Sequence, residues 1–249
     1  MEILEWGLLV ALFAAFAAGT ISGLTGFGLA LISVPLLLFV YEPQTVVLIT
    51  VFISLVVNVS VVRDSRRDAD RGIVWAMLLP CLIGVIAGAE VLRAVDPLYL
   101  RLFIGAFVVF SAVLLLRSVR IPGANTRWGP VLAGGASGAL STATGLAAPP
   151  IVLLLASREY AKRSFRGTSG LFFLFLSVFG LIALLLRGLI RPEDAVIATI
   201  LLPAAMIGKY LGTRLLGLIS EAYFRLLTLV FTLVTGALGA ATAAFALLG

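Results

Sequence analysis

The chain of 249 residues has no histidine, a single cysteine and few charges. Without histidine, the usual general base, proton relay and metal ligand are all missing. The lone Cys81 excludes an intrachain disulfide and a metal site built from several cysteines. Charged residues make up 12% of the chain, whereas soluble domains usually contain about 25%. So few charges cannot cover a globular surface, and a water-soluble monomer is excluded.

Hydrophobic residues account for 61% of the chain and form runs of membrane-spanning length. A helix needs about 20 residues to cross a hydrocarbon core. The sequence therefore predicts an all-α polytopic protein in a lipid bilayer. Because the only early charges are Glu2 and Glu5, the first run does not resemble a cleavable signal peptide, and we expect it to be retained. The six expected spans are 45–62, 72–92, 98–116, 164–186, 195–218 and 224–248.

Two further apolar regions are interrupted by glycine or proline. Residues 22–28 separate the arms 8–21 and 29–40, and residues 139–150 separate the arms 128–138 and 151–157. Each arm, at about 1.5 Å per residue, is shorter than a hydrocarbon core. We therefore expect two broken or re-entrant hairpins.

The two halves of the chain resemble each other. Ser22-Gly23 recurs as Ser137-Gly138, 115 residues later, and Gly84 and Gly88 match Gly208 and Gly212. The expected domains are a first repeat, 1–120, with its hairpin in 6–40, and a second, 121–249, with its hairpin in 128–157. Each repeat then contains a hairpin region and three transmembrane helices. Because three spans per repeat is an odd number, the second repeat is expected to be inverted.

Lysine and arginine mark the cytoplasmic loops of membrane proteins. The loops 63–71, 117–127 and 158–166 hold four, three and four of them, whereas 93–101 and 187–194 hold two each. The sequence thus predicts that the first three loops are cytoplasmic and that both termini lie on the outer side of the inner membrane. The net charge of +6 then reflects orientation, and no nucleic-acid partner is expected.

Paired interruptions in two inverted halves indicate a transporter binding site. Helix ends exposed there offer N–H groups that suit an anion, and hydroxyl groups add donors. The alternative is that the glycines only allow close helix packing. The hairpin residues expected to bind substrate are Ser22, Gly23, Thr25, Gly26, Gly28, Ser137, Gly138, Thr142, Thr144, Gly145 and Pro149, and Ser141 is a further donor.

These segments carry a family resemblance. Residues 19–35, GTISGLTGFGLALISVP, resemble the first conserved motif of the sulfite exporter TauE/SafE family of membrane transporters. Residues 138–150, GALSTATGLAAPP, are similar to the second, and Arg166-Gly-Thr-Ser169 resembles the start of the following helix. Leu29 and Ala30, and also Ala147 and Ala148, stand where the family has glycines. The resemblance implies transport of small sulfur-containing anions such as sulfite or organosulfonates.

Charges at membrane depth are costly and are often functional. Lys209 lies deep in its span and either attracts the anion or extends toward the cytoplasmic interface. Glu90 is an interfacial charge, but it is also the leading carboxylate for proton coupling. Asn58 either contacts substrate or links two helices. Thr168 and Ser169 either face the anion at a helix N-terminus or cap that helix.

The sequence favours a secondary transporter or facilitator that exports sulfite or an organosulfonate. Alternatives are a transporter of another small anion or metabolite, and a membrane scaffold that transports nothing. No catalytic constellation or nucleotide-binding loop is present, so we expect neither an enzyme nor a cofactor. The exact substrate, coupling ion, direction and oligomeric state are not determined by the sequence.

Overall fold

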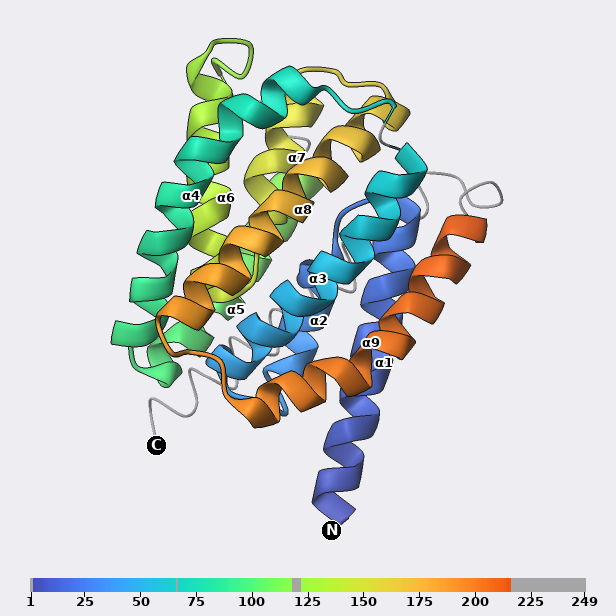
Figure 1. Ribbon diagram of the computed structural model, residues 1–249, viewed down its shortest axis with the longest axis vertical. Helices are drawn as coiled ribbons and strands as arrows, with labels where there is room; N and C mark the ends of the chain where they lie inside the picture. The colour runs from blue at the N-terminus through green and yellow to red at the C-terminus, as the bar shows by residue number, and fades with distance from the viewer. Residues whose placement is uncertain (1, 66, 118–121, 216–249) are drawn as a thin grey trace.

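The computed structural model describes residues 2–65, 67–117 and 122–215. In this part of the chain the ordered elements are nine α-helices and no strands (Figure 1). Of the expected spans, 224–248 and the end of 195–218 lie outside the described residues. The helices are α1 (Glu2–Thr25), α2 (Leu29–Leu37), α3 (Pro43–Ser65), α4 (Arg71–Ala94), α5 (Pro97–Leu116), α6 (Trp128–Thr144), α7 (Ala148–Ser157), α8 (Lys162–Leu186) and α9 (Pro192–Leu215).

Among these described helices, α1, α3, α4, α8 and α9 are long and apolar enough to cross a membrane. Large apolar side chains on their outer faces are exposed, as on α4, where Trp75, Leu79 and Ile83 form a stripe. A contiguous apolar surface of this kind is unusual for a soluble monomer. In a bilayer these side chains would contact lipid.

The first interrupted region differs from the expected pair of short arms. Helix α1 has 24 residues and continues through Gly19 and Gly23 before it ends at Thr25. It extends through these glycines because they lie against α9, where close packing supports the helix. Among the described helices, α2, with 9 residues, and α7, with 10, are much shorter than the length needed to cross. Each interrupted region is thus a longer helix followed by a short, mostly buried one.

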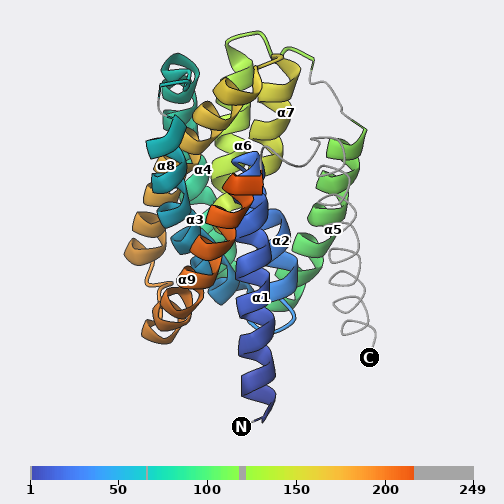
Figure 2. The ribbon, with the colours of Figure 1, turned by 90° about the vertical axis from the view of Figure 1, so that its right-hand side faces the viewer.

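Helices α1 and α9 pack side by side, and glycines on both bring their backbones together (Figure 2). A Cβ atom on Gly19 would lie 2.1 Å from the carbonyl oxygen of Ala205, and one on Gly208 would lie 2.1 Å from that of Phe16. Contacts further along join Gly23 with Lys209 and Gly212 with Thr20, so the two helices run in the same direction.

Helices α4 and α6 form a second pair of the same kind. A Cβ atom on Gly84 would lie 2.1 Å from the carbonyl oxygen of Gly135, and one on Gly138 would lie 2.2 Å from that of Cys81. The glycines spaced by four residues, Gly84/Gly88 and Gly208/Gly212, thus lie at these two helix contacts.

Helix α3 lies between these two pairs and packs beside α8 (Figure 1). Gly170 of α8 contacts Val61, and Gly180 contacts Val51, so α3 and α8 are antiparallel. In Figure 1, α1, α3 and α9 run upward, and α4, α6 and α8 run downward. The core between them is built mainly from Ala, Val, Leu and Ile side chains.

Candidate functional site

The turn between α1 and α2 is organised by Thr25. Its hydroxyl donates to the carbonyl oxygen of Ile21 at 2.9 Å and accepts from the N–H of Phe27 at 3.1 Å. The N–H of Gly26 donates to the carbonyl oxygen of Ser22 at 2.8 Å and ends α1. Gly26 (φ 79°) and Gly28 (φ 97°) adopt left-handed conformations that suit glycine.

The turn between α6 and α7 repeats this arrangement around Thr144. Its hydroxyl donates to the carbonyl oxygen of Leu140 at 2.7 Å and accepts from the N–H of Leu146 at 3.2 Å. Gly145, at φ 80°, donates its N–H to the carbonyl oxygen of Ser141 at 2.9 Å. The two turns therefore have the same local hydrogen bonding.

The short helices that follow the turns differ in the donors they offer. Helix α2 begins after Gly28 and has no side-chain cap, so the N–H groups of its first turn are available to a ligand. Helix α7 begins at Ala148, and the next two residues, Pro149 and Pro150, have no N–H. The turn between α1 and α2 therefore offers more backbone N–H groups to an anion than the turn between α6 and α7.

Several buried polar side chains are available to a ligand. Ser22, Asn58 and Ser141 are residues at least 95% buried, and within the described chain their side chains form no hydrogen bond, although their polar atoms are not completely enclosed. The hydroxyl of Thr50 in α3 is also buried without a partner in that part of the chain, and this residue lies beside Gly145. Buried polar groups without a partner are rare, because each costs about 1–3 kcal/mol.

Other polar residues expected at the site are already bonded within the protein. Thr142 donates to the carbonyl oxygen of Val85 at 2.7 Å, and Ser137 donates to that of Ala147 at 2.8 Å. Thr168 accepts from the N–H of Asp70 at 2.9 Å, and Ser169 donates to the carbonyl oxygen of Arg166 at 3.3 Å. In this conformation these hydroxyls join helices or stabilise their ends.

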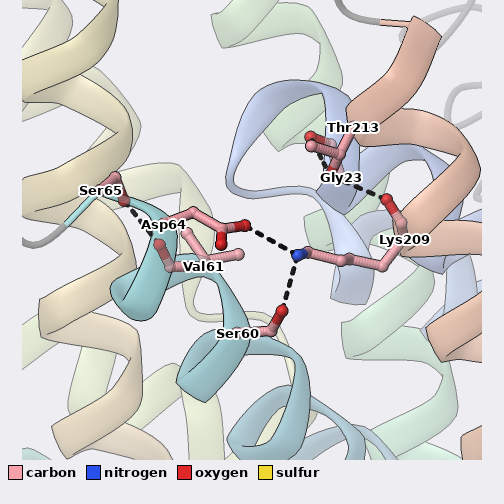
Figure 3. Close-up of polar contacts among 7 residues, drawn as sticks. All are labelled: Gly23, Ser60, Val61, Asp64, Ser65, Lys209 and Thr213. Carbon is pink, nitrogen blue, oxygen red and sulfur yellow. Dashed lines mark hydrogen bonds and ion pairs between the residues drawn. The ribbon is translucent and has the colours of Figure 1, made fainter.

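Lys209 is the most buried charged side chain near the first turn (Figure 3). It is 6% exposed, and its Nζ donates to Ser60 Oγ at 2.6 Å and to Asp64 Oδ2 at 3.0 Å. Asp64 lies at the end of α3, and 46% of its side chain is exposed. Lys209 thus points inward to α3 and is neutralised there.

Glu90 lies at the opposite end of the helices. It forms ion pairs with Arg93, at 3.1 Å, and with Arg187, just after α8. Its side chain is 36% exposed. Since α3 and α8 are antiparallel, this end is remote from Asp64.

A second polar contact joins the loops that precede α4 and α8. The hydroxyl of Tyr160 donates to Asp70 Oδ2 and lowers the pKa of that carboxyl, assisted by the N–H of Ile73. Burial, and then the hydrogen bond to Asp70, raise the pKa of Tyr160 to about 12. In the same region Arg158 binds the carbonyl oxygens of Ala124 and Thr126, so it holds a loop in place.

A model of the sulfite exporter TauE/SafE family matches residues 11–238 of the chain. The chain belongs to this family. The family is one of membrane transporters, in agreement with the apolar helices. No curated protein and no solved structure matches the chain.

The residues expected at the site of this TauE/SafE protein lie in two groups. Lys209 and the start of α8, which carries Thr168 and Ser169, lie next to the first turn. The second group surrounds the turn at Gly145 and includes Ser137 and Thr142. Helix α3 connects the groups, since Thr50 is near the second turn and Asp64 contacts Lys209.

The candidate residues taken from the sequence did not include Thr50, Ser60 and Asp64. Thr50 was detectable as a polar residue well inside an apolar run, as Asn58 was. Asp64 was not, because it stands among basic loop residues at the end of a span. Across the described residues, no group of three cysteine or carboxylate side chains is placed to hold a metal ion.

Proposed function

We propose that the protein is a secondary transporter or facilitator that exports sulfite or an organosulfonate across the inner membrane. The observation that carries this proposal is the match to the sulfite exporter TauE/SafE family over residues 11–238. The two helix turns add physical support, because irregular backbone at membrane depth is tolerated where it is buried in protein or lines a polar path.

The fold is proposed to consist of two inverted repeats, 1–120 and 121–249. In this pairing α1 corresponds to α6, α2 to α7, α3 to α8 and α4 to α9. Three observations support it: Thr25 and Thr144 organise the same turn, α1 packs on α9 as α6 packs on α4, and corresponding long helices run in opposite directions.

A further pair of contacts supports the same correspondence. The hydroxyl of Thr45 donates to Asp194 Oδ1 at 2.8 Å, which joins the start of α3 to the first turn of α9. Thr168 and Asp70 join the corresponding ends of α8 and α4. Each repeat thus contributes its first helix to a pair with the other repeat. Such an exchange suits rocking of the two halves around a central site.

The substrate is proposed to bind between the two turns through backbone N–H groups and hydroxyls. Gly23, Gly26, Gly28, Gly138, Gly145 and Pro149 shape the turns and the adjoining helices, and Thr25, Thr144, Ser137, Thr142, Thr168 and Ser169 are further candidates. The strongest candidates are Ser22, Ser141 and Asn58, because their side chains form no hydrogen bond with the described residues and substrate could bind them without breaking one. The cytoplasmic side is proposed to be the one with loops 63–71 and 158–166, and the termini lie outside.

The test is flux of labelled sulfite and sulfoacetate in liposomes that contain the purified protein. We expect flux above that of empty liposomes. Ser141→Ala should raise the half-saturating sulfite concentration roughly three- to tenfold, the value of one neutral hydrogen bond. Thr199→Ala is the matched control, since Thr199 is exposed and its hydroxyl binds its own helix at Ala195. No flux of any small sulfur oxyanion would contradict the proposed function.

A further inference from the structure

Lys209 is held in a place where an isolated cation would be very unfavourable. A buried ammonium group must be paired and hydrogen-bonded, because its desolvation is costly. Ser60 and Asp64 provide the two acceptors (Figure 3). Asp64 is partly exposed, so its carboxylate can move toward water when another anion takes its place beside Lys209.

Arg166, in the second turn of α8, is the second cation at this place. Its side chain lies on Gly26, where a Cβ atom would be 2.7 Å from the Arg166 Cγ atom. Its Nε and Nη2 groups are buried, and neither has a hydrogen-bond partner among the described residues. The next residue, Gly167, packs against the Ser65 carbonyl oxygen, which brings Arg166 within electrostatic influence of Asp64.

The cluster formed by Lys209, Arg166 and Asp64 has unbalanced charges. Lys209 and Arg166 are two cations, whereas Asp64 is a single anion that binds Lys209. A guanidinium group presents several N–H donors in a fixed plane, and this geometry suits an anion with two or more oxygen atoms. An oxyanion in contact with Arg166 would satisfy the buried donors and remove the excess positive charge.

At the second turn, the described side chains nearest to Gly145 carry no charge. A Cβ atom on Gly145 would meet Val34 and Thr50, both neutral, where Gly26 meets Arg166. In the part of the chain that the structure describes, the charged donors therefore lie at the turn that also offers the N–H groups of α2. In the proposed orientation this turn is at the cytoplasmic end of α3, the side from which an exporter collects its substrate.

We propose that Arg166 and Lys209 bind the transported oxyanion at the turn between α1 and α2, and that Asp64 occupies Lys209 until the anion replaces it. This assignment rests on the proposed function, and it joins Lys209, a candidate already indicated by the sequence, with Arg166 and Asp64 in one site. Arg166 and Lys209 contact the substrate, and Asp64 acts as a competing internal anion.

The test measures sulfite binding by thermal unfolding of the full-length protein in detergent, at constant ionic strength, alongside flux in liposomes. Arg166→Gln and Lys209→Met should raise the half-saturating sulfite concentration about tenfold or more, the usual value of a charge-assisted hydrogen bond. Asp64→Asn should lower it, because the competitor is gone. Arg163→Gln is the control, since Arg163 is exposed on the same end of α8, and should leave it unchanged.

A purely structural role for Asp64 would lower stability without changing the half-saturating concentration. An unchanged value in Arg166→Gln and Asp64→Asn would overturn the assignment, and Arg166→Gln decides this even where Lys209→Met fails to fold. Sulfite that binds through Arg166 but is not transported would overturn the proposed function and leave the site. Transport with the wild-type half-saturating concentration in these variants would overturn the site and leave the proposed function. The absence of stabilisation by sulfite, sulfate or methanesulfonate would also overturn the site.

Discussion

Gly138 and Cys81 are in such close contact that a Cβ atom on Gly138 would lie 2.2 Å from the Cys81 carbonyl oxygen. Neither backbone can withdraw easily, because both belong to long helices that touch along most of their length. The position thus tests whether α4 and α6 are packed as tightly as their glycines allow.

Gly138→Ala should destabilise the protein by about 1–3 kcal/mol, the usual cost of overpacking. Gly135→Ala is the matched control on the same helix, since its Cβ would have ordinary contacts at 3.6 Å or more with Pro80. This control should be neutral or stabilising, because alanine favours a helix by roughly 1 kcal/mol over glycine. Thermal unfolding in detergent measures both, and equal effects would contradict the close contact.

Gly145→Ala should destabilise the protein by more than the backbone strain at this position alone. An alanine in a left-handed conformation costs about 1–2 kcal/mol, and its Cβ would also lie 2.9 Å from Val34 Cγ2. Gly123→Ala shares the strain, at φ 79°, but has no contact closer than 3.8 Å. We expect the larger loss of melting temperature in Gly145→Ala, and Val34→Ala should recover part of it. Failure of that rescue would mean that Val34 does not limit the turn.

The helix-contact glycines and the two interruptions were predictable because their causes are local. Glycines four residues apart lie on one face of a helix, and the turns at Gly26 and Gly145 fall within the two stretches that glycine or proline interrupts. The repeat register was less certain. Sequence identity aligned Ser22 with Ser137, whereas equivalent hydrogen bonds join Ser22 to Gly26 and Ser141 to Gly145. The difference is about one helical turn, so both alignments keep the same face of the helix.

The length of α1 and the partner of Lys209 were not predictable in this way. Glycines that interrupt an isolated helix are tolerated in α1 because α9 packs against them. Lys209 and Asp64 are 145 residues apart in sequence, and only the packing of α9 against α3 brings them together. A buried lysine signals that a partner exists, but its identity depends on tertiary contacts.

The contact between Tyr160 and Asp70 should make stability depend on pH in a defined direction. The pKa of Asp70 is lowered from 3.8 by the hydrogen bond from Tyr160, so its contribution is present above pH 3.8 and is lost as the pH falls through the lower folded-state value. Tyr160→Phe should lower the melting temperature at neutral pH, and the difference from wild type should shrink in acid. Tyr99→Phe, at an exposed position, is the control. A difference that is constant with pH would contradict this role.

Labelling of single cysteines in intact cells should report the orientation of α4. Arg67→Cys lies before this helix, and Ala94→Cys lies at its end, and both positions are exposed. An impermeant maleimide should label position 94 from outside but position 67 only after the cells are opened. The native Cys81 is fully buried, so the unmodified protein serves as the unlabelled control. The reverse pattern would overturn the orientation and, with it, the assignment of the Arg166 site to the cytoplasmic side.

Glu90 remains the candidate for proton coupling, and its two ion pairs give the idea a physical form. Protonation would break its bonds to Arg93 and Arg187 and so release the end of α4 from the end of α8. Glu90→Gln should abolish any stimulation of sulfite flux by a proton gradient while flux down a sulfite gradient continues. The loss of stability should be small, about 1 kcal/mol or less for each exposed ion pair. Glu193→Gln, an exposed carboxylate at the start of α9, should change neither flux, and stimulation that persists in Glu90→Gln would exclude Glu90 as the coupling group.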